Sequence, residues 1–132
     1  IFVDPDKWDE NFTDQWNTQL YRQAQRYPNL PLSSKVKGVV SLYDVSDDWI
    51  PIYDKSSLPG FYMAVGSSGN QYKNAPIAGV MMAKLIEQCE KGHDHDKDPV
   101  KLHLKYINRE IDIGFYSRNR VINSESSMSV LG

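Results

Sequence analysis

The hydrophobic positions near the N-terminus recur every four residues, which is typical of an amphipathic helix. They are Trp8, Phe12, Trp16, Leu20 and Ala24. Asp4 and Pro5 predict the start of this helix as N-cap and first helical residue. Pro28 and Pro31 predict that it ends near Tyr27. We expect the tryptophans to pack in a core, with the lining of a substrate cavity as the alternative.

The chain then changes to short apolar runs that predict strands. β-branched residues favour a strand over residues 35–43, and a second short strand is expected over 49–53. The pattern over residues 100–108 leaves a short helix and a turn both open. Residues 111–115 predict a last short strand or an extended arm, and the serine-rich segment 121–132 predicts a frayed, flexible tail.

The centre of the chain predicts a strand, a glycine loop and a helix in that order. The strand is expected over residues 61–65 and the loop over 66–73. Asn74 is the predicted N-cap, Pro76 lies in the first helical turn, and Gly92 is suited to the C-terminal end. The helix is expected to be largely buried because its residues are mostly apolar.

The loop before this helix has the composition of a binding site. Gly66 and Gly69 allow positive φ angles and close approach of another group to the backbone. A helix start carries unpaired N–H groups and partial positive charge, and Lys73 adds a full charge. These features predict a site for an anion or an electron-rich ring. The alternative is an ordinary strand–helix connection with a surface lysine. Two glycines do not make the dinucleotide fingerprint G-x-G-x-x-G.

The amino-acid composition excludes some classes of function. The 132 residues are one domain's worth of chain, and 40% hydrophobic with 24% charged residues is typical of a soluble globular protein. A net charge of −2 gives no basic surface for nucleic acid or an anionic membrane. The single cysteine, Cys89, excludes an internal disulfide and indicates a reducing compartment. We therefore expect a cytoplasmic protein, with an organelle matrix as the alternative.

The run from Lys91 to Pro99 is the most polar in the chain. Its two histidines and three aspartates suggest a metal site, but no third His or Cys completes a closed one. We therefore expect a mobile, metal-free loop in solvent. Ser67 and Ser68 do not form a nucleophile elbow, and Cys89 is expected to be an inert thiol in a buried helix.

Three stretches occur in an order and spacing that resembles a known family. They are residues 41–48, 51–54 and 59–76. They resemble the C-terminal part of FAD-dependent oxidoreductases of the D-amino-acid oxidase superfamily, in the branch of sarcosine and glycine oxidases. Residues 112–113 and 117–120 resemble the segment with which such proteins end.

The resemblance implies an α+β fold that is the C-terminal fragment of a two-domain, Rossmann-like FAD-binding oxidoreductase. Residues 1–40 would end the substrate domain, 41–120 would return into the FAD-binding domain, and 121–132 would be the tail. The glycine fingerprint is not in this chain, and the N-terminus looks like a cut inside a longer one. We therefore expect the chain alone to bind no FAD, to be inactive and to self-associate, with the missing N-terminal half as its natural partner.

The implied reaction is oxidation of the C–N bond of an amino acid or secondary amine by hydride transfer to FAD. The implied cofactor-binding residues are those of the loop: Gly66, Ser67, Ser68, Gly69, Asn70 and Gln71. Lys73 would bind the substrate carboxylate, or alternatively pair with an aspartate of the missing half. Ser41 stands where some relatives tether FAD through cysteine, so FAD is expected to be non-covalent there. No catalytic residue is expected in this fragment. The alternative function is a non-catalytic α+β interaction module.

Overall fold

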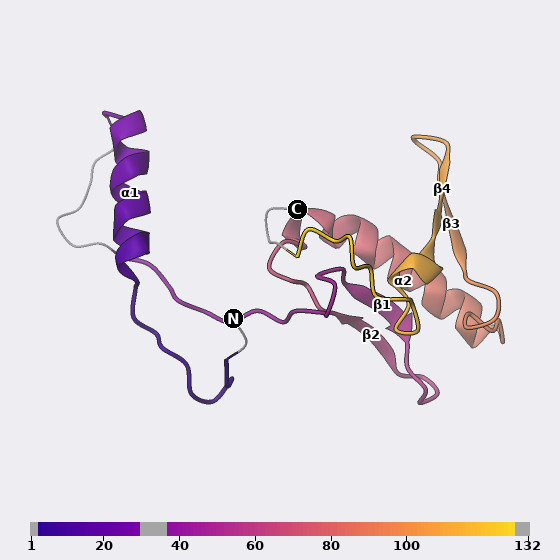
Figure 1. Cartoon of the computed structure of the whole chain (residues 1–132). Coiled ribbons are helices and arrows are strands. Elements are labelled where there is room, and N and C mark those ends of the chain that lie inside the picture. Colours follow the sequence, from indigo (N-terminus) through magenta and orange to yellow (C-terminus); the bar gives the residue numbers. More distant parts are fainter. Residues whose placement is uncertain (1–2, 30–36, 129–132) are drawn as a thin grey trace. The chain divides into compact units, whose positions relative to one another are not determined.

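The computed structural model describes residues 3–29 and 37–128, and it shows a small α+β protein (Figure 1). The described residues form two α-helices and two small antiparallel sheets. The chain divides into two compact units, Ile1–Leu42 and Tyr43–Gly132. No helix in the described ranges is long and apolar enough to cross a bilayer.

The first unit contains helix α1, Asp14–Arg26. Its predicted end is confirmed at Tyr27, but its predicted start at Asp4 and Pro5 is wrong. The carboxylate of Asp4 accepts the N–H of Asp6 at 3.0 Å, so this aspartate closes a local turn. The helix instead begins after Thr13, whose hydroxyl accepts the N–H of Trp16 at 3.4 Å.

The tryptophan stripe of α1 does not form a buried core. No residue of α1 is buried, and Trp16 is 43% exposed. Its ring stacks on Phe12 at a centroid distance of 5.7 Å. A β-carbon at Gly38 would lie about 3.0 Å from Trp16. The apolar stripe thus lies against Gly38 without being buried, and the expectation of a packed tryptophan core is wrong.

The predicted strand over residues 35–43 is also wrong for its described part. Residues 37–43 have extended or irregular backbone without a strand, while residues 35 and 36 lie outside the described ranges. A β-branched composition favours a strand only where a neighbouring strand pairs with it. No described segment forms a ladder with residues 37–43.

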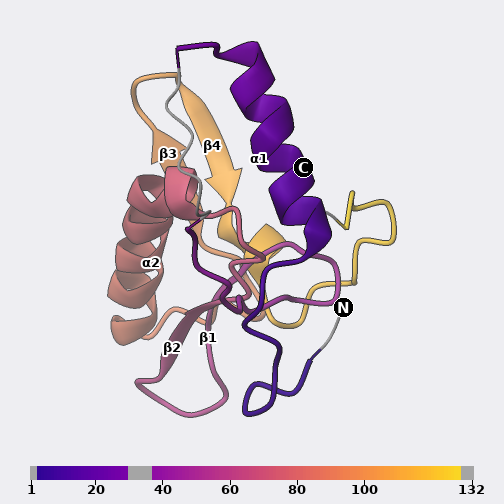
Figure 2. The same ribbon diagram turned by 90° about the vertical axis from the view of Figure 1, so that its left-hand side faces the viewer.

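The second unit contains the two sheets. Strand β1, Ile52–Lys55, pairs with β2, Tyr62–Val65, with Tyr53 opposite Ala64. Strand β3, Lys101–Leu104, pairs with β4, Arg109–Asp112 (Figure 2). The strand predicted over 61–65 is confirmed within one residue, and the one predicted over 49–53 begins only after Pro51. The helix or turn expected over 100–108 is instead β3 and its hairpin turn. The last strand ends at Asp112, and the 3₁₀ helix η2, Ile113–Tyr116, follows.

Helix α2, Ala75–Glu90, confirms the predicted helix and its boundaries. It follows a 3₁₀ turn, η1, at Tyr72–Asn74. Asn74 is the N-cap residue and Pro76 lies in the first turn, although the Asn74 side chain makes no cap hydrogen bond. Gly92 has φ +90°, which suits a glycine after a helix end.

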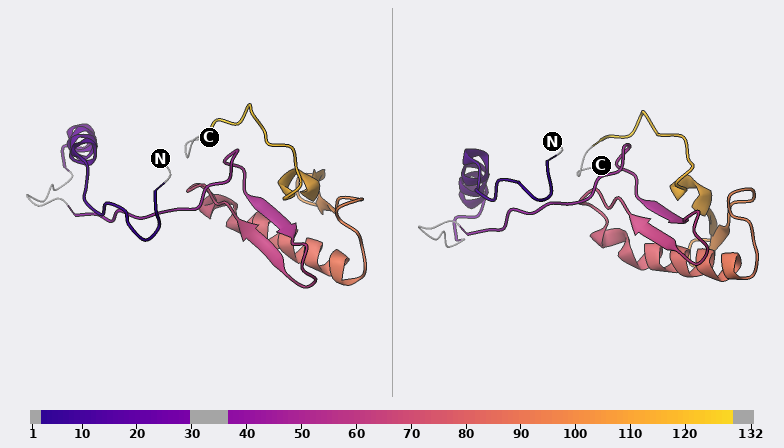
Figure 3. Two further views of the ribbon diagram at one scale, coloured as in Figure 1. Left: turned by 60° about the horizontal axis from the view of Figure 1, so that its bottom comes forward. Right: turned by 90° about the horizontal axis from the view of Figure 1, so that it is seen from below.

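The core lies where α2 meets the β1–β2 hairpin, and views from several sides show the helix along one face of the hairpin (Figures 1 and 3). Its buried apolar residues are Tyr53, Met81, Leu85, Val100 and Ile113. Only Met81 and Leu85 of α2 are buried, while Val80 is 51% exposed. The prediction of a largely buried helix is therefore wrong, because a two-stranded sheet covers only one side of it. Residues 121–128 contain no helix or strand.

Candidate functional site

The loop between β2 and α2, which we call the glycine loop, comprises residues 66–71. Its backbone is left-handed at three positions: φ is +70° at Gly66, +51° at Ser68 and +76° at Gly69. Glycine adopts such angles without strain, whereas serine pays a steric cost. Ser68 is fully buried, and its hydroxyl donates to the carbonyl of Gly66 at 3.1 Å. The loop therefore has one defined shape.

The start of the glycine loop is held by Asp44. The carboxylate oxygen Oδ2 accepts the backbone N–H of Gly66 and that of Ser67, the latter at 3.1 Å. Oδ1 accepts the Ser67 hydroxyl at 2.7 Å, and the backbone carbonyl of Asp44 accepts the N–H of Ser68 at 2.8 Å. The hydrogen bond from the Ser67 hydroxyl, together with those from the N–H groups, lowers the pKa of Asp44.

The segment that carries Asp44 also sets the space around both glycines. A β-carbon at Gly66 would lie 3.2 Å from the β-carbon of Ser46, and one at Gly69 would lie 3.4 Å from the Tyr43 ring. The turn after this segment is held by hydrogen bonds of its own. Asp48 is fully buried and accepts hydrogen bonds from the Arg120 guanidinium at 2.6 and 3.0 Å. These hydrogen bonds lower the pKa of Asp48.

The end of the glycine loop is held by the side chain of Gln71. Its carbonyl oxygen accepts the Tyr53 hydroxyl at 3.2 Å and the Asn74 amide at 3.0 Å. Its amide group donates to the side chain of Asn70. Tyr53 belongs to β1 and is 5% exposed, so this end of the loop is attached to the core.

These contacts show which backbone N–H groups of the predicted cofactor-binding residues already donate a hydrogen bond. The N–H groups of Gly66, Ser67 and Ser68 all bind Asp44, and that of Asn70 donates to the Ser67 carbonyl at 3.2 Å. Within the described residues, the N–H groups of Gly69 and Gln71 donate no hydrogen bond. The predicted residues are thus brought together, and two of their backbone donors have no partner among the described residues.

Lys73, the predicted substrate-binding residue, lies in η1 directly before α2 and is exposed. It makes no ion pair with any residue in the described ranges. The dipole of the 16-residue helix α2 adds partial positive charge near this end. Ser41 is exposed and belongs to the first compact unit, whereas the glycine loop belongs to the second.

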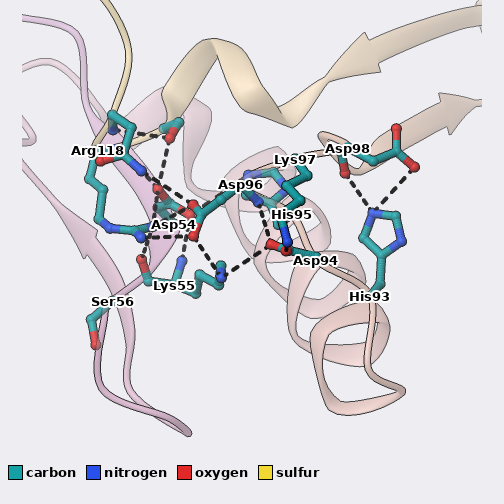
Figure 4. A network of polar contacts seen from close by, with 12 residues as sticks. Asp54, Lys55, Ser56, His93, Asp94, His95, Asp96, Lys97, Asp98 and Arg118 are labelled. Atoms are coloured by element: carbon teal, nitrogen blue, oxygen red, sulfur yellow. Dashed lines mark hydrogen bonds and ion pairs between the residues drawn. The ribbon is translucent and has the colours of Figure 1, made fainter.

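Sequence reasoning missed a buried polar network that joins β1, the loop 91–99 and the segment after η2 (Figure 4). At its centre, Asp54 is fully buried and accepts the Ser117 hydroxyl at 2.9 Å and the Arg118 guanidinium at 3.0 Å. The same guanidinium binds Asp96 at 3.0 Å, and the Lys55 ammonium lies 2.8 Å from Asp96. Hydrogen bonds from Arg118 and Lys55 lower the pKa of Asp96 to about 2.

His95 lies inside this network, so the expectation of a loop in solvent is wrong at this residue. It is 2% exposed, and its Nδ1 accepts the N–H of Val100 at 2.9 Å. Nδ1 is therefore unprotonated, and the ring proton resides on Nε2. Nε2 has no hydrogen-bond partner and lies 3.7 Å from Asp54 Oδ1. Burial lowers the pKa of His95 despite the nearby carboxylates, so the ring is neutral.

The network has the properties of a structural clamp. No group of three or more potential metal ligands occurs among the described residues. Its two carboxylates are each bound by a cation, and the Ser117 hydroxyl donates to Asp54, so it is not activated by a base. Arg118 of the S-R-N-R stretch was a signal in the sequence, because arginine is well suited to buried ion pairs with carboxylates.

A groove of about 420 Å³ lies at the C-terminal end of α2, away from the glycine loop. It is lined by residues 55–62 and by part of 89–93, and it includes none of the predicted site residues. Two of its polar side chains are already paired: the Tyr62 hydroxyl donates to Glu90 at 2.6 Å, and Lys55 binds Asp96.

Parts of the three ordered stretches on which the sequence-based family hypothesis rests contribute to the glycine loop or its supports. Residues 43–48 bind the start of the loop, β1 provides Tyr53, and residues 62–76 form the strand, the loop and the helix start. Comparison of the chain with family models, with curated proteins and with solved structures finds no match.

Proposed function

We propose that this chain is the C-terminal part of an FAD-dependent enzyme that oxidises the C–N bond of an amino acid or secondary amine. One observation supports it above the others. The glycine loop is fixed at both ends, by Asp44 and by Tyr53, while the N–H groups of Gly69 and Gln71 stay available within the described residues. Fixed donors beside a helix start are suited to a ligand that gains negative charge during reaction.

The unpartnered donors of the loop support FAD as the proposed ligand. The pyrimidine edge of a flavin carries carbonyl oxygens that accept hydrogen bonds, and Gly69 and Gln71 offer two N–H donors. When bound, FAD would supply the acceptor for the hydride, and the protein would supply binding and electrostatics. The dipole of α2 would favour negative charge next to its N-terminal end.

The exposed ammonium of Lys73 indicates the class of substrate that we propose. Its ammonium is exposed, makes no ion pair with a described residue, and lies within one turn of the available donors in the sequence. A cation at this position would bind the carboxylate of an amino acid and so orient the substrate. An amine without a carboxylate would lose that contact.

The proposal is tested on the natural product of the gene that encodes this chain. We expect the purified product to carry a yellow chromophore that is bleached by an amino acid or secondary amine under anaerobic conditions. Riboflavin or FAD supplied during expression ensures that the cofactor is not limiting. A folded product that takes up no flavin contradicts the proposal and favours the non-catalytic interaction module.

A further inference from the structure

Consecutive backbone N–H groups at the start of the glycine loop point at one carboxylate. Gly66 and Ser67 both donate to Asp44 Oδ2, which lies more than twenty residues earlier in the chain. Successive N–H groups that converge in this way form a concave site for an anion, as in many phosphate-binding loops. Here the anion belongs to the protein itself.

The hydrogen bonds to Asp44 favour an ionised carboxylate. Such a group accepts only, and all of its partners here are donors: two N–H groups and the Ser67 hydroxyl. The N–H groups of Gly69 and Gln71 are not among those that Asp44 accepts, so these two donors are separate from the first site.

From this geometry we infer that Asp44 is a positioning residue, an internal anion that fills the first donor site of the loop. It excludes phosphate and other anions from Gly66 and Ser67, and it fixes Gly69 and Gln71 for a ring carbonyl. The role of Asp44 in shaping the loop follows from the contacts alone. Only the identity of the ring, a flavin, rests on the proposed function.

The test replaces Asp44 with alanine in the full 132-residue chain and supplies formate to the vacant site. Amide hydrogen exchange measured by NMR reports on each loop residue. We expect exchange at Gly66 and Ser67 to accelerate about tenfold or more, because each loses a charge-assisted hydrogen bond. Gly69 and Gln71 should shift in the same spectra. Formate should reverse these changes, and inorganic phosphate should bind to the variant but not to the parent chain.

Two further variants make the result specific. Asp44→Leu keeps the shape of the side chain but presents no acceptor and leaves no room for formate, so exchange should accelerate without rescue by formate. It also serves if Asp44→Ala does not fold. Asp47→Ala removes an exposed aspartate that accepts no hydrogen bond from a described residue, and it should change nothing. Unchanged exchange at Gly66 and Ser67 in either Asp44 variant overturns the inference, as does accelerated exchange in Asp44→Ala that formate does not reverse.

A flavin measurement on the natural gene product separates this inference from the proposed function. Asp44→Ala should weaken flavin binding, and formate should restore it. If the loop responds and formate rescues it, but no form binds flavin, then Asp44 has its positioning role and the flavin assignment is wrong. If flavin binds equally to parent and variant and loop exchange is unchanged, the inference about Asp44 is wrong and the proposed function survives.

Discussion

Arg118 donates two hydrogen bonds to one oxygen of Asp54, from its backbone N–H at 2.8 Å and from its guanidinium at 3.0 Å. The guanidinium also donates to the Lys55 carbonyl at 2.9 Å and to both oxygens of Asp96. One side chain thereby connects β1, the polar loop and the C-terminal segment (Figure 4). These segments meet only in the folded chain, so the contact acts on global stability.

Replacing Asp54 with asparagine should destabilise the second unit strongly. Asp54 is fully buried, and the substitution removes one of the two carboxylates that pair with the Arg118 guanidinium, the other being Asp96. Removing one partner of a buried ion pair typically costs about 3–5 kcal/mol. We expect a smaller loss, about 2 kcal/mol, because Asp96 still pairs with Arg118. Urea unfolding followed by circular dichroism measures the loss. The control Asp47→Asn, at an exposed site, should change stability by less than about 0.5 kcal/mol. A loss at Asp54 as small as that of the control would show that the network contributes little.

Stability should fall between neutral and mildly acidic pH because of His95. Burial lowers the pKa of His95 in the folded chain below its unfolded value of about 6.5. Below that pH the unfolded state binds a proton that the folded state does not, so stability is complete above about 6.5 and falls as the pH decreases. The second proton would have to enter at Nδ1, where it would break the hydrogen bond from Val100.

The measurement is the urea midpoint of the parent chain and of His95→Asn at several pH values from 7.5 down to about 5. Asparagine can retain an acceptor for the Val100 N–H but does not titrate, so its curve should be flatter in this window. The carboxylates affect stability in a lower pH range than His95 does. The pKa of Asp96 is about 2, so its stabilisation is lost only as the pH falls below about 4. Equal slopes for parent and His95→Asn above pH 5 would exclude His95 as the cause.

Gly66 and Gly60 provide a matched pair for the glycine loop. Both have positive φ, +70° and +76°, so alanine strains the backbone at either site by about 1–2 kcal/mol. A β-carbon at Gly60 meets nothing within 4 Å, whereas one at Gly66 would lie 3.2 Å from Ser46. Gly66→Ala should therefore cost more than Gly60→Ala and should also disturb the bonds to Asp44. The urea midpoints of the two variants are compared. Equal losses of stability would show that the loop adjusts to the β-carbon at Gly66 without further cost.

The sequence was sufficient where short-range chemistry determines structure. Asn74, Pro76 and Gly92 predicted both ends of α2, because caps and prolines act within one turn. The same logic was wrong for Asp4, which has the composition of a cap but hydrogen-bonds within a turn. Thr13 offers an equivalent signal nine residues later, and no local rule ranks the two.

Local sequence patterns do not predict contacts between residues that are distant in the chain. His95 lies in a polar run, and its burial depends on Asp54 and Arg118, which are distant in the chain. In the candidate site, the glycine loop and Lys73 were predicted from glycine spacing and resemblance. No role was predicted for Asp44 beyond its place in the stretch 41–48, since nothing near it in the sequence indicates that its partners are Gly66 and Ser67.

Lys73→Met in the natural gene product tests the proposed carboxylate contact. The variant removes a charge-assisted contact worth about 1.5–3 kcal/mol, so kcat/KM for an amino acid should fall roughly ten- to hundredfold. The matching amine without a carboxylate should be affected little, because it never made the contact. Flavin should still bind, since its expected partners are backbone N–H groups of the glycine loop.

The comparison of kcat/KM between the two substrates distinguishes a carboxylate contact of Lys73 from a structural role. Steady-state kinetics with the amino acid and the amine are compared for the parent, for Lys73→Met and for Lys91→Met. Lys91 is an exposed lysine at the other end of α2, and its loss should change neither substrate's kcat/KM. If Lys73 instead pairs with an aspartate elsewhere in the protein, Lys73→Met should lower stability and impair both substrates alike. An equal loss for both would leave Lys73 as a structural residue and remove the reason for expecting a carboxylate in the substrate.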